Sequence, residues 1–202
     1  MKHTDYSTSS PAKLAIMASG SGSNAENFIH FFRDHPRIMV ALIISGKPGA
    51  YVLERAKKAG IPGVVLNPGA AGDRGEAERI FDQYRIDAVV LAGYMKLIPP
   101  WLINRYPGKI FNIHPALLPK FGGKGMYGMH VHRAVIAAGE KKSGISIHLV
   151  NEAYDEGRVL FQASLDVLPQ DTPKSLAEKV KKLEHAHYPE VVEKQLLSRL
   201  HV

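Results

Sequence analysis

Two polar side chains, Asn112 and His114, stand at the end of an apolar run over Lys109–Ile113 and could do acid–base chemistry. Residues two apart in a strand project to the same side of a sheet, so the amide and the imidazole would face one space. An amide can donate to a developing oxyanion, and an imidazole can pass a proton near neutral pH. The fixed backbone of Pro115 and Pro119 is expected to hold the pair in place. A histidine at a strand end can also be a purely structural, hydrogen-bonded residue.

A carboxylate in a downstream polar loop could adjust the acidity of His114. The loop, residues 151–157, contains Glu152, Asp155 and Glu156. A nearby carboxylate raises the pKa of an imidazole because it stabilises the protonated ring, so more of His114 would be protonated and able to act as the acid near neutral pH. Residue types alone do not choose among the three acids, and such a loop is also typical of a solvated turn.

The glycine-rich segment Ser19–Asn24 lies between the first predicted strand and the first predicted helix. Glycines there permit a tight turn and let backbone amides approach a ligand, while the helix N-terminus favours an anion, most readily phosphate. A dinucleotide fingerprint would require an acidic residue at the end of the second strand, but that strand ends in Ser45, Gly46 and Lys47. No Gly-Lys-Ser/Thr follows the glycines, which excludes a Walker loop.

The composition is that of one ordinary globular domain: 202 residues, 45% hydrophobic and 22% charged, with no cysteine. The absence of cysteine excludes disulfides and thiolate chemistry. The net charge of +7 predicts an anionic partner, but the basic residues are dispersed, so nucleic acid is not favoured. The apolar run at 38–44 is too short to span a membrane, and the polar residues 1–12 predict a flexible lead-in to a cytoplasmic protein.

Short apolar runs alternate with amphipathic segments, which predicts an α/β fold: a single-domain, Rossmann-like, mainly parallel sheet. Two late strand-like runs, 143–150 and 159–167, are joined by too few residues for a crossover helix, so they should form an antiparallel hairpin. Thr172 and Pro173 signal the start of a closing helix. The other expected strands are 14–18, 38–44, 88–91 and 109–113, and the other expected helices are 24–32, 52–59, 76–84, 100–105 and 131–138.

Four segments together resemble the folate-dependent glycinamide ribonucleotide formyltransferase family: SGSGSN, DAVVLAGYMKLIP, FNIHPALLPKF and the YDEG loop. The resemblance runs from about Lys13 to Leu197, so residues 13–202 are expected to form one formyltransferase domain. It implies transfer of the formyl group of 10-formyltetrahydrofolate to the amine of glycinamide ribonucleotide, in purine biosynthesis. It also implies no metal, no nucleic acid or membrane partner, and a monomer or homodimer.

The resemblance assigns residues to three roles. Asn112, His114 and Asp155 match the catalytic residues, which selects Asp155 from the three acids. The positions that match folate contacts are Arg74, Met95, Lys96, Leu97 and Ile98, together with Asn112. The positions that match ribonucleotide contacts are Gly22, Ser23, Asn24 and Glu184.

Two departures and three rival functions qualify this expectation. Lys96 stands where an arginine is common, and the loop 122–128 is longer than expected, either a mobile lid or a tolerated insertion. His130 and His132 follow the loop, but two histidines do not complete a metal site. The rivals are a formyltetrahydrofolate hydrolase, a formyltransferase acting on aminoacyl-tRNA, and a non-catalytic Rossmann-like protein that binds a phosphorylated ligand. Only the last would need neither Asn112 nor His114.

Overall fold

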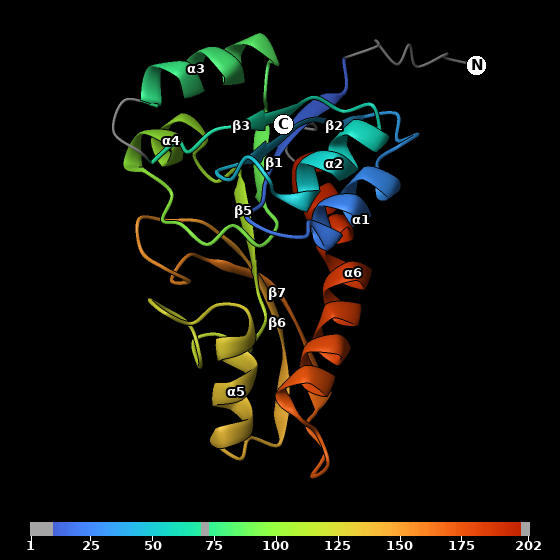
Figure 1. Cartoon of the computed structure of the whole chain (residues 1–202), viewed down its shortest axis with the longest axis vertical. Helices are drawn as coiled ribbons and strands as arrows, with labels where there is room; N and C mark the ends of the chain where they lie inside the picture. The colour runs from blue at the N-terminus through green and yellow to red at the C-terminus, as the bar shows by residue number, and fades with distance from the viewer. Residues whose placement is uncertain (1–9, 70–72, 199–202) are drawn as a thin grey trace, which may run out of the picture.

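A seven-stranded sheet forms the centre of the computed structural model, which describes residues 10–69 and 73–198 (Figure 1). The strand order is β3-β2-β1-β4-β5-β6-β7; the first five strands are parallel, and β6 and β7 are antiparallel. The elements in chain order are β1 (Ala12–Met17), α1 (Ser23–Phe31), β2 (Ile38–Ser45), α2 (Tyr51–Lys58), β3 (Gly63–Val65), α3 (Arg74–Gln83), β4 (Ala88–Leu91), α4 (Pro100–Arg105), β5 (Ile110–His114), α5 (Met129–Ala137), β6 (Lys142–Leu149), β7 (Val159–Asp166) and α6 (Pro173–Leu197). The α/β class, the mainly parallel sheet and the C-terminal hairpin with its closing helix are confirmed.

Helices cover both faces of the sheet, which explains why β1, β2 and β4 are almost continuously apolar. α1, α2, α5 and α6 pack on one face around a core that includes Phe28, Phe111 and Tyr188. α3 and α4 pack on the other face around Phe81 and Leu102. Figure 1 shows α1, α2 and α6 on one side of β1 and α3 and α4 on the other, with α6 extending from the hairpin end of the molecule up to α1. Burial of these apolar faces positions the strand ends that carry the polar side chains.

The antiparallel strands place polar side chains of neighbouring strands opposite each other. Asn112 of β5 lies opposite His148 of β6, and His114 lies opposite Ser146. Residues directly opposite each other in neighbouring strands point to the same face of the sheet. The two expected site residues of β5 therefore each gain a polar neighbour from β6.

Two details differ from the expected layout. β3 was not anticipated, because Gly63–Val65 is a three-residue edge strand, too short to show a periodic pattern. The lead-in expected over residues 1–12 falls on residues 1–9, which lie outside the described residues, and on residues 10–12, of which Ala12 already begins β1. Across the two described ranges, no helix combines the length and apolarity needed to cross a membrane.

Candidate active site

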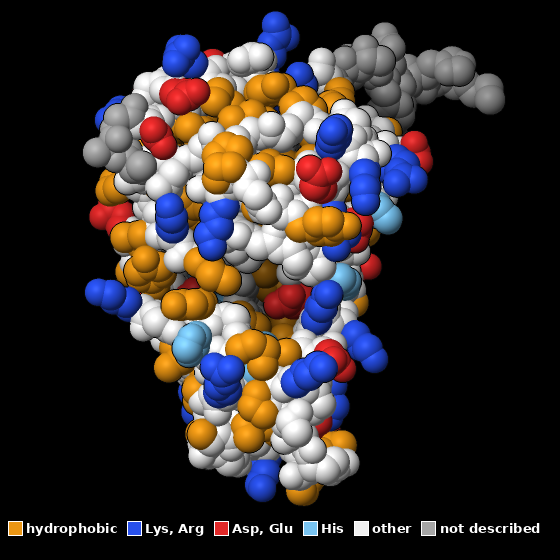
Figure 2. All heavy atoms as spheres, in the orientation of Figure 1, with side chains coloured by type: hydrophobic (Ala, Val, Ile, Leu, Met, Phe, Trp, Pro, Cys, Tyr) orange, Lys and Arg blue, Asp and Glu red, His pale blue; other side chains and the backbone are white. Residues whose placement is uncertain are grey.

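A cavity of ≈ 510 Å³ lies where β4 and β5 end, between the parallel half of the sheet and the loop before α5. Figure 2 shows it as a hollow at mid-height with hydrophobic side chains around the rim. Its walls include Asn112, His114 and Asp155, the three residues expected to act in catalysis. Ligands of open α/β sheets bind at this edge, where parallel strands end.

His148 determines which way the Asn112 amide points. Its Nδ1 lies 2.9 Å from the carbonyl oxygen of Leu149, so Nδ1 carries the hydrogen and donates. Nε2 of the neutral ring then accepts from Asn112 Nδ2 at 3.1 Å. The amide group of Asn112 also lies 3.4 Å from Asp155 Oδ1. Sequence reasoning missed His148; the signal for it was a histidine near the end of the predicted strand 143–150.

His114 is held at both ring nitrogens and is only 3% exposed. Nε2 donates to the carbonyl oxygen of Phe121 at 2.7 Å, and Nδ1 lies 3.3 Å from Asp155 Oδ2. A neutral ring with its hydrogen on Nε2 presents a lone pair to the carboxylate. A proton on Nδ1 turns this contact into a charge-assisted hydrogen bond. His114 and Asp155 are thus a coupled pair that can hold a proton between them.

The Asp155 carboxylate raises the pKa of His114, as expected, but the net shift of that pKa is downward. Burial has the largest influence and lowers the pKa of His114, whereas the charge of Asp155 and the Phe121 carbonyl raise it by less. The physical reason is desolvation, which penalises the charged ring and cannot be read from a local sequence. For Asp155, burial acts to raise the pKa, but His148, His114 and the Gly123 amide together hold it below its ordinary value.

The backbone of the Asp-x-Gly segment directs the Asp155 carboxylate into the cavity. Asp155 has a φ of +58°, a left-handed conformation that Asp tolerates better than most residues. A side chain at Gly157 would place its Cβ 1.6 Å from the carbonyl oxygen of Leu149, so only glycine fits there. Glu152 and Glu156 are exposed and do not line the cavity. The structure therefore brings one of the three loop acids to His114.

Glu184 of α6 lies across the cavity beside Asn24 of α1. Asn24 Nδ2 donates to Glu184 Oε2 at 2.8 Å, while Asn24 Oδ1 is buried without a partner. Burial raises the pKa of Glu184 more than Asn24 and Lys181 lower it. A partly buried carboxylate beside a solvent-filled cavity is suited to accept hydrogen bonds from an amine or hydroxyl.

We expect Glu184→Gln to stabilise the fold at neutral pH. A carboxyl group that binds its proton more tightly when folded lowers the free energy of unfolding as the pH rises through its titration range. Glutamine removes that loss and can donate to the orphaned Asn24 Oδ1, worth about 1 kcal/mol. Thermal unfolding should give a higher Tm for the variant at pH 8 and little gain at pH 4. Glu178→Gln, an exposed change on the same helix, is the control, and an equal gain in both variants would contradict this account.

A side chain of α2 binds the glycine segment before α1. Arg55 Nε donates to the Ser21 carbonyl oxygen at 2.8 Å, and its guanidinium pairs with Glu26. Gly22, at a φ of +72°, packs so tightly that an added Cβ would lie 2.4 Å from Val52 Cγ2. No side chain caps α1, so its first amides are left for a ligand. Sequence reasoning missed Arg55, which gives no local sign of its contact 34 residues back.

The residues expected to contact folate separate into two groups. Met95, Lys96, Leu97 and Ile98 all line the cavity. Arg74 does not: it is exposed at the start of α3, where Nε donates to Glu78 at 3.0 Å. Among the positions expected to contact the ribonucleotide, Asn24 and Glu184 line the cavity. Gly22 and Ser23 come directly before Asn24 in the chain and do not line it.

The long glycine loop closes the cavity on the side of α5. Residues 123–128 of this loop line it. The Gly123 amide donates to Asp155 Oδ2 at 3.0 Å, and a Cβ added at Gly122 would lie 2.5 Å from Leu118 Cδ2 and 3.3 Å from Asp155 Cβ. The loop therefore contacts Asp155, while Phe121, just before the loop, contacts His114. No group of three or more His, Asp or Glu side chains in the described parts of the chain could hold a metal ion.

Residues 12–192 match the formyl transferase family model. The chain is 37% identical over 190 residues to the phosphoribosylglycinamide formyltransferase of Bacillus subtilis, covering 92% of this chain and 94% of that protein. The crystal structure of glycinamide ribonucleotide transformylase 1 from Geobacillus kaustophilus superimposes with a TM-score of 0.83 at 35% identity, covering 93% of this chain and 100% of that one.

A chloroplastic relative from Arabidopsis thaliana, also named phosphoribosylglycinamide formyltransferase, is 43% identical over 187 residues. The match covers 89% of this chain. This chain spans 64% of the length of that relative and 60% of a second chloroplastic relative, from Vigna unguiculata.

Proposed function

The chain belongs to the formyl transferase family, and from that premise we propose that it transfers the formyl group of 10-formyltetrahydrofolate to the amine of glycinamide ribonucleotide, in purine biosynthesis. The observation that carries the proposal is the convergence of Asn112, His114 and Asp155 on one cavity that the Asn24–Glu184 pair also lines. Chemistry on a formyl group and recognition of an amine-bearing partner both require polar groups at those two places.

The cavity fits a large, partly aromatic co-substrate. Its volume suits a ligand of that size, and most of its walls are apolar. Met95 and Leu97 are exposed on the rim, where a flat ring system can displace water from them. In the proposed complex, 10-formyltetrahydrofolate lies along residues 95–98 and supplies the formyl carbon that the ribonucleotide amine attacks.

In the proposed reaction, the Asn112 amide stabilises negative charge that develops on the formyl oxygen. Because burial lowers the pKa of His114, the neutral ring can accept, at Nδ1 beside Asp155, the proton that the attacking amine releases. The protonated ring then adds positive charge near the formyl oxygen. The bond between the formyl carbon and the folate nitrogen breaks, and that nitrogen takes the proton that the His114–Asp155 pair returns. Holding both reactants in register supplies up to roughly 7–11 kcal/mol in favourable cases.

One assay tests the proposal against its rivals. The protein is mixed with 10-formyltetrahydrofolate, with and without glycinamide ribonucleotide, and formylated ribonucleotide and released formate are measured. A transferase forms the first product only when both substrates are present. Formate released without the ribonucleotide would indicate the hydrolase, and binding with neither product would indicate a non-catalytic protein.

Gly22→Ala should weaken ribonucleotide binding, because the segment before α1 is proposed to hold its phosphate. Alanine disfavours a φ of +72° by about 1–2 kcal/mol, and its Cβ would collide with Val52. We therefore expect the KM for the ribonucleotide to rise at least tenfold and the KM for the folate to change little. Gly20→Ala is the control, since nothing lies within 4 Å of a Cβ built there. A KM equally raised in both variants, or in neither, would refute this placement of the phosphate.

The proposal also covers the cellular location and the oligomeric state of the protein. We propose a cytoplasmic protein, as the sequence predicted, although the plant relatives are named as chloroplastic. A monomer or homodimer also stays a prediction.

A further inference from the structure

Three polar side chains form one row across three neighbouring strands. His114 of β5 lies opposite Ser146 of β6, and Ser146 lies opposite Gln162 of β7. All three project to the face on which the chain leaves β5. His114 belongs to the proposed catalytic machinery, whereas Ser146 and Gln162 have had no role so far.

Ser146 and Gln162 bind the backbone that follows His114. Ser146 Oγ donates to the Ala116 carbonyl oxygen at 2.7 Å and accepts from the Leu118 amide at 2.9 Å. Gln162 Nε2 donates to Ser146 Oγ at 2.7 Å and to the Leu118 carbonyl oxygen at 3.0 Å. Ser146 is fully buried, so its bonds to Ala116 and Leu118 form away from water and a lost partner there would be costly. Gln162 is itself exposed, and its two bonds are partly buried.

The bound segment returns to His114 seven residues later. The Phe121 carbonyl oxygen accepts the hydrogen of His114 Nε2, which closes residues 114–121 into a loop. Ser146 and Gln162 bind this loop at its middle, residues 116–118. The position of the Phe121 carbonyl, and with it the nitrogen of His114 that carries the hydrogen, therefore depends on the two hairpin side chains.

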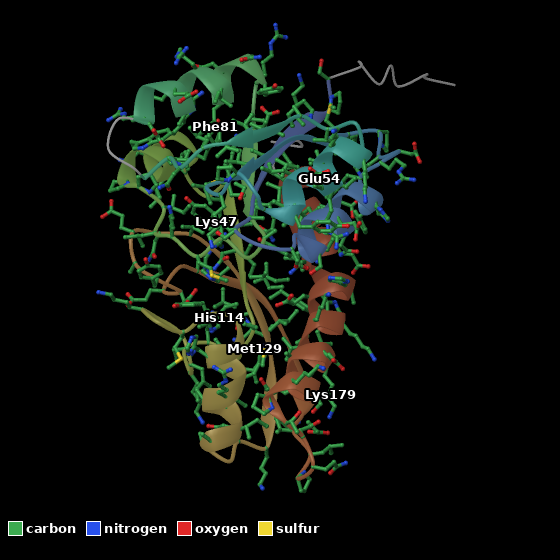
Figure 3. The ribbon with its side chains drawn as sticks, in the orientation of Figure 1. Lys47, Glu54, Phe81, His114, Met129 and Lys179 are labelled. Atoms are coloured by element: carbon green, nitrogen blue, oxygen red, sulfur yellow. The ribbon has the colours of Figure 1, made fainter. Side chains whose placement is uncertain are left out.

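We propose that Ser146 and Gln162 are positioning residues: through the 114–121 loop they fix the tautomer and orientation of the His114 ring. The consequence for catalysis rests on the proposed function, but the consequence for the ring does not. With the hydrogen held on Nε2, Nδ1 is the nitrogen that exchanges a proton next to Asp155. Figure 3 shows His114 between the parallel half of the sheet and α5, where the loop turns back.

Gln162→Glu is the sharpest test, because a carboxylate of the same shape accepts hydrogen bonds but cannot donate one to the Leu118 carbonyl. The first readout is the pair of ¹⁵N chemical shifts of the His114 ring, which report its tautomer without any substrate. In the parent protein we expect the Nε2–H tautomer at high pH. In Gln162→Glu and Ser146→Ala we expect mixed tautomers. In Ser146→Ala, which adds no charge, we also expect a lower His114 pKa, since the Phe121 carbonyl favours the protonated ring.

The second readout is steady-state kinetics. Misplacement of the ring should lower kcat about tenfold to a hundredfold in each variant and leave both KM values within about threefold. The double variant should lose little more than Ser146→Ala alone, because the two side chains act through one network.

Two controls separate positioning from general stability. Ser164→Ala changes an exposed residue of β7 on the same face as Gln162 and should alter neither readout. Phe81→Leu weakens the core on the other side of the sheet, and should lower Tm without moving the His114 signals.

The inference and the proposed function would be refuted by different results. Unchanged His114 shifts and an unchanged pH profile in Gln162→Glu and Ser146→Ala, with Tm lowered as in Phe81→Leu, would overturn the inference. A parent protein without formyl transfer would refute the proposed function, while the ¹⁵N shifts would still decide the inference.

Discussion

His114→Ala is expected to lower kcat for formyl transfer by about 10²–10⁴-fold, the usual range for a group that transfers protons at the reacting centre. The ring is buried in the cavity wall, between the Phe121 carbonyl and Asp155. The other imidazole beside that carboxylate, His148, lies 3.6 Å from Asp155 Oδ1 and is held at Nδ1 by the Leu149 carbonyl. KM for both substrates should change little, because the ring contributes to the transition state more than to ground-state binding.

The measurement is steady-state kinetics on protein whose fold has been checked by thermal unfolding. His130→Ala is the matched control: His130 is exposed on α5, outside the cavity wall, and its loss should leave kcat unchanged. Turnover in His114→Ala within threefold of the parent enzyme would remove His114 from the proposed mechanism.

Asp155→Asn should produce the second large loss, about 10²-fold or more in kcat. Asparagine also tolerates a left-handed φ, so the substitution removes the charge and leaves the backbone at +58°. Asp155 raises the pKa of His114 against the dominant effect of burial, so the ring should become still harder to protonate. The kinetic pKa assigned to His114 should therefore move to lower pH.

The same substitution should change how stability depends on pH. The pKa of Asp155 is depressed in the folded protein, so its contribution is present above the unfolded pKa and is lost as the pH falls through the folded pKa. Asp155→Asn should abolish that part of the loss in acid. Glu152→Gln and Glu156→Gln are the matched controls in the same loop. A loss of kcat in either control as large as in Asp155→Asn would show that the wrong acid has been assigned.

Local sequence patterns predicted two features of the site. The spacing of Asn112 and His114 in an apolar strand predicted two side chains on one side of the sheet, and both line the cavity. The glycines before α1 predicted a turn with free amides, and Gly22 adopts the left-handed conformation that such a turn uses. These features depend on the strand repeat and on backbone conformation, which are properties of neighbouring residues.

The resemblance of four segments to a known family added what the residues alone left open. It selected Asp155 from three acids, and the structure brings that carboxylate, not Glu152 or Glu156, next to His114. It also assigned Arg74 to the folate site, but Arg74 lies outside the cavity and pairs with Glu78. Its proposed role stays untested.

Only the tertiary structure decided the direction of the pKa shift of His114 and which side chains hold the site residues in place. The pKa of His114 falls because burial outweighs the nearby carboxylate, and burial is a sum over residues distant in the chain. His148 and Ser146 of β6 lie opposite Asn112 and His114 of β5, and Gln162 of β7 lies opposite Ser146. The side-chain hydrogen bonds of these three residues join positions 16 to 44 residues apart in the chain. The sequence by itself determined which groups could do the chemistry; the pairing of β5, β6 and β7 decided their partners, because contacts across a sheet leave no periodic trace in any one segment.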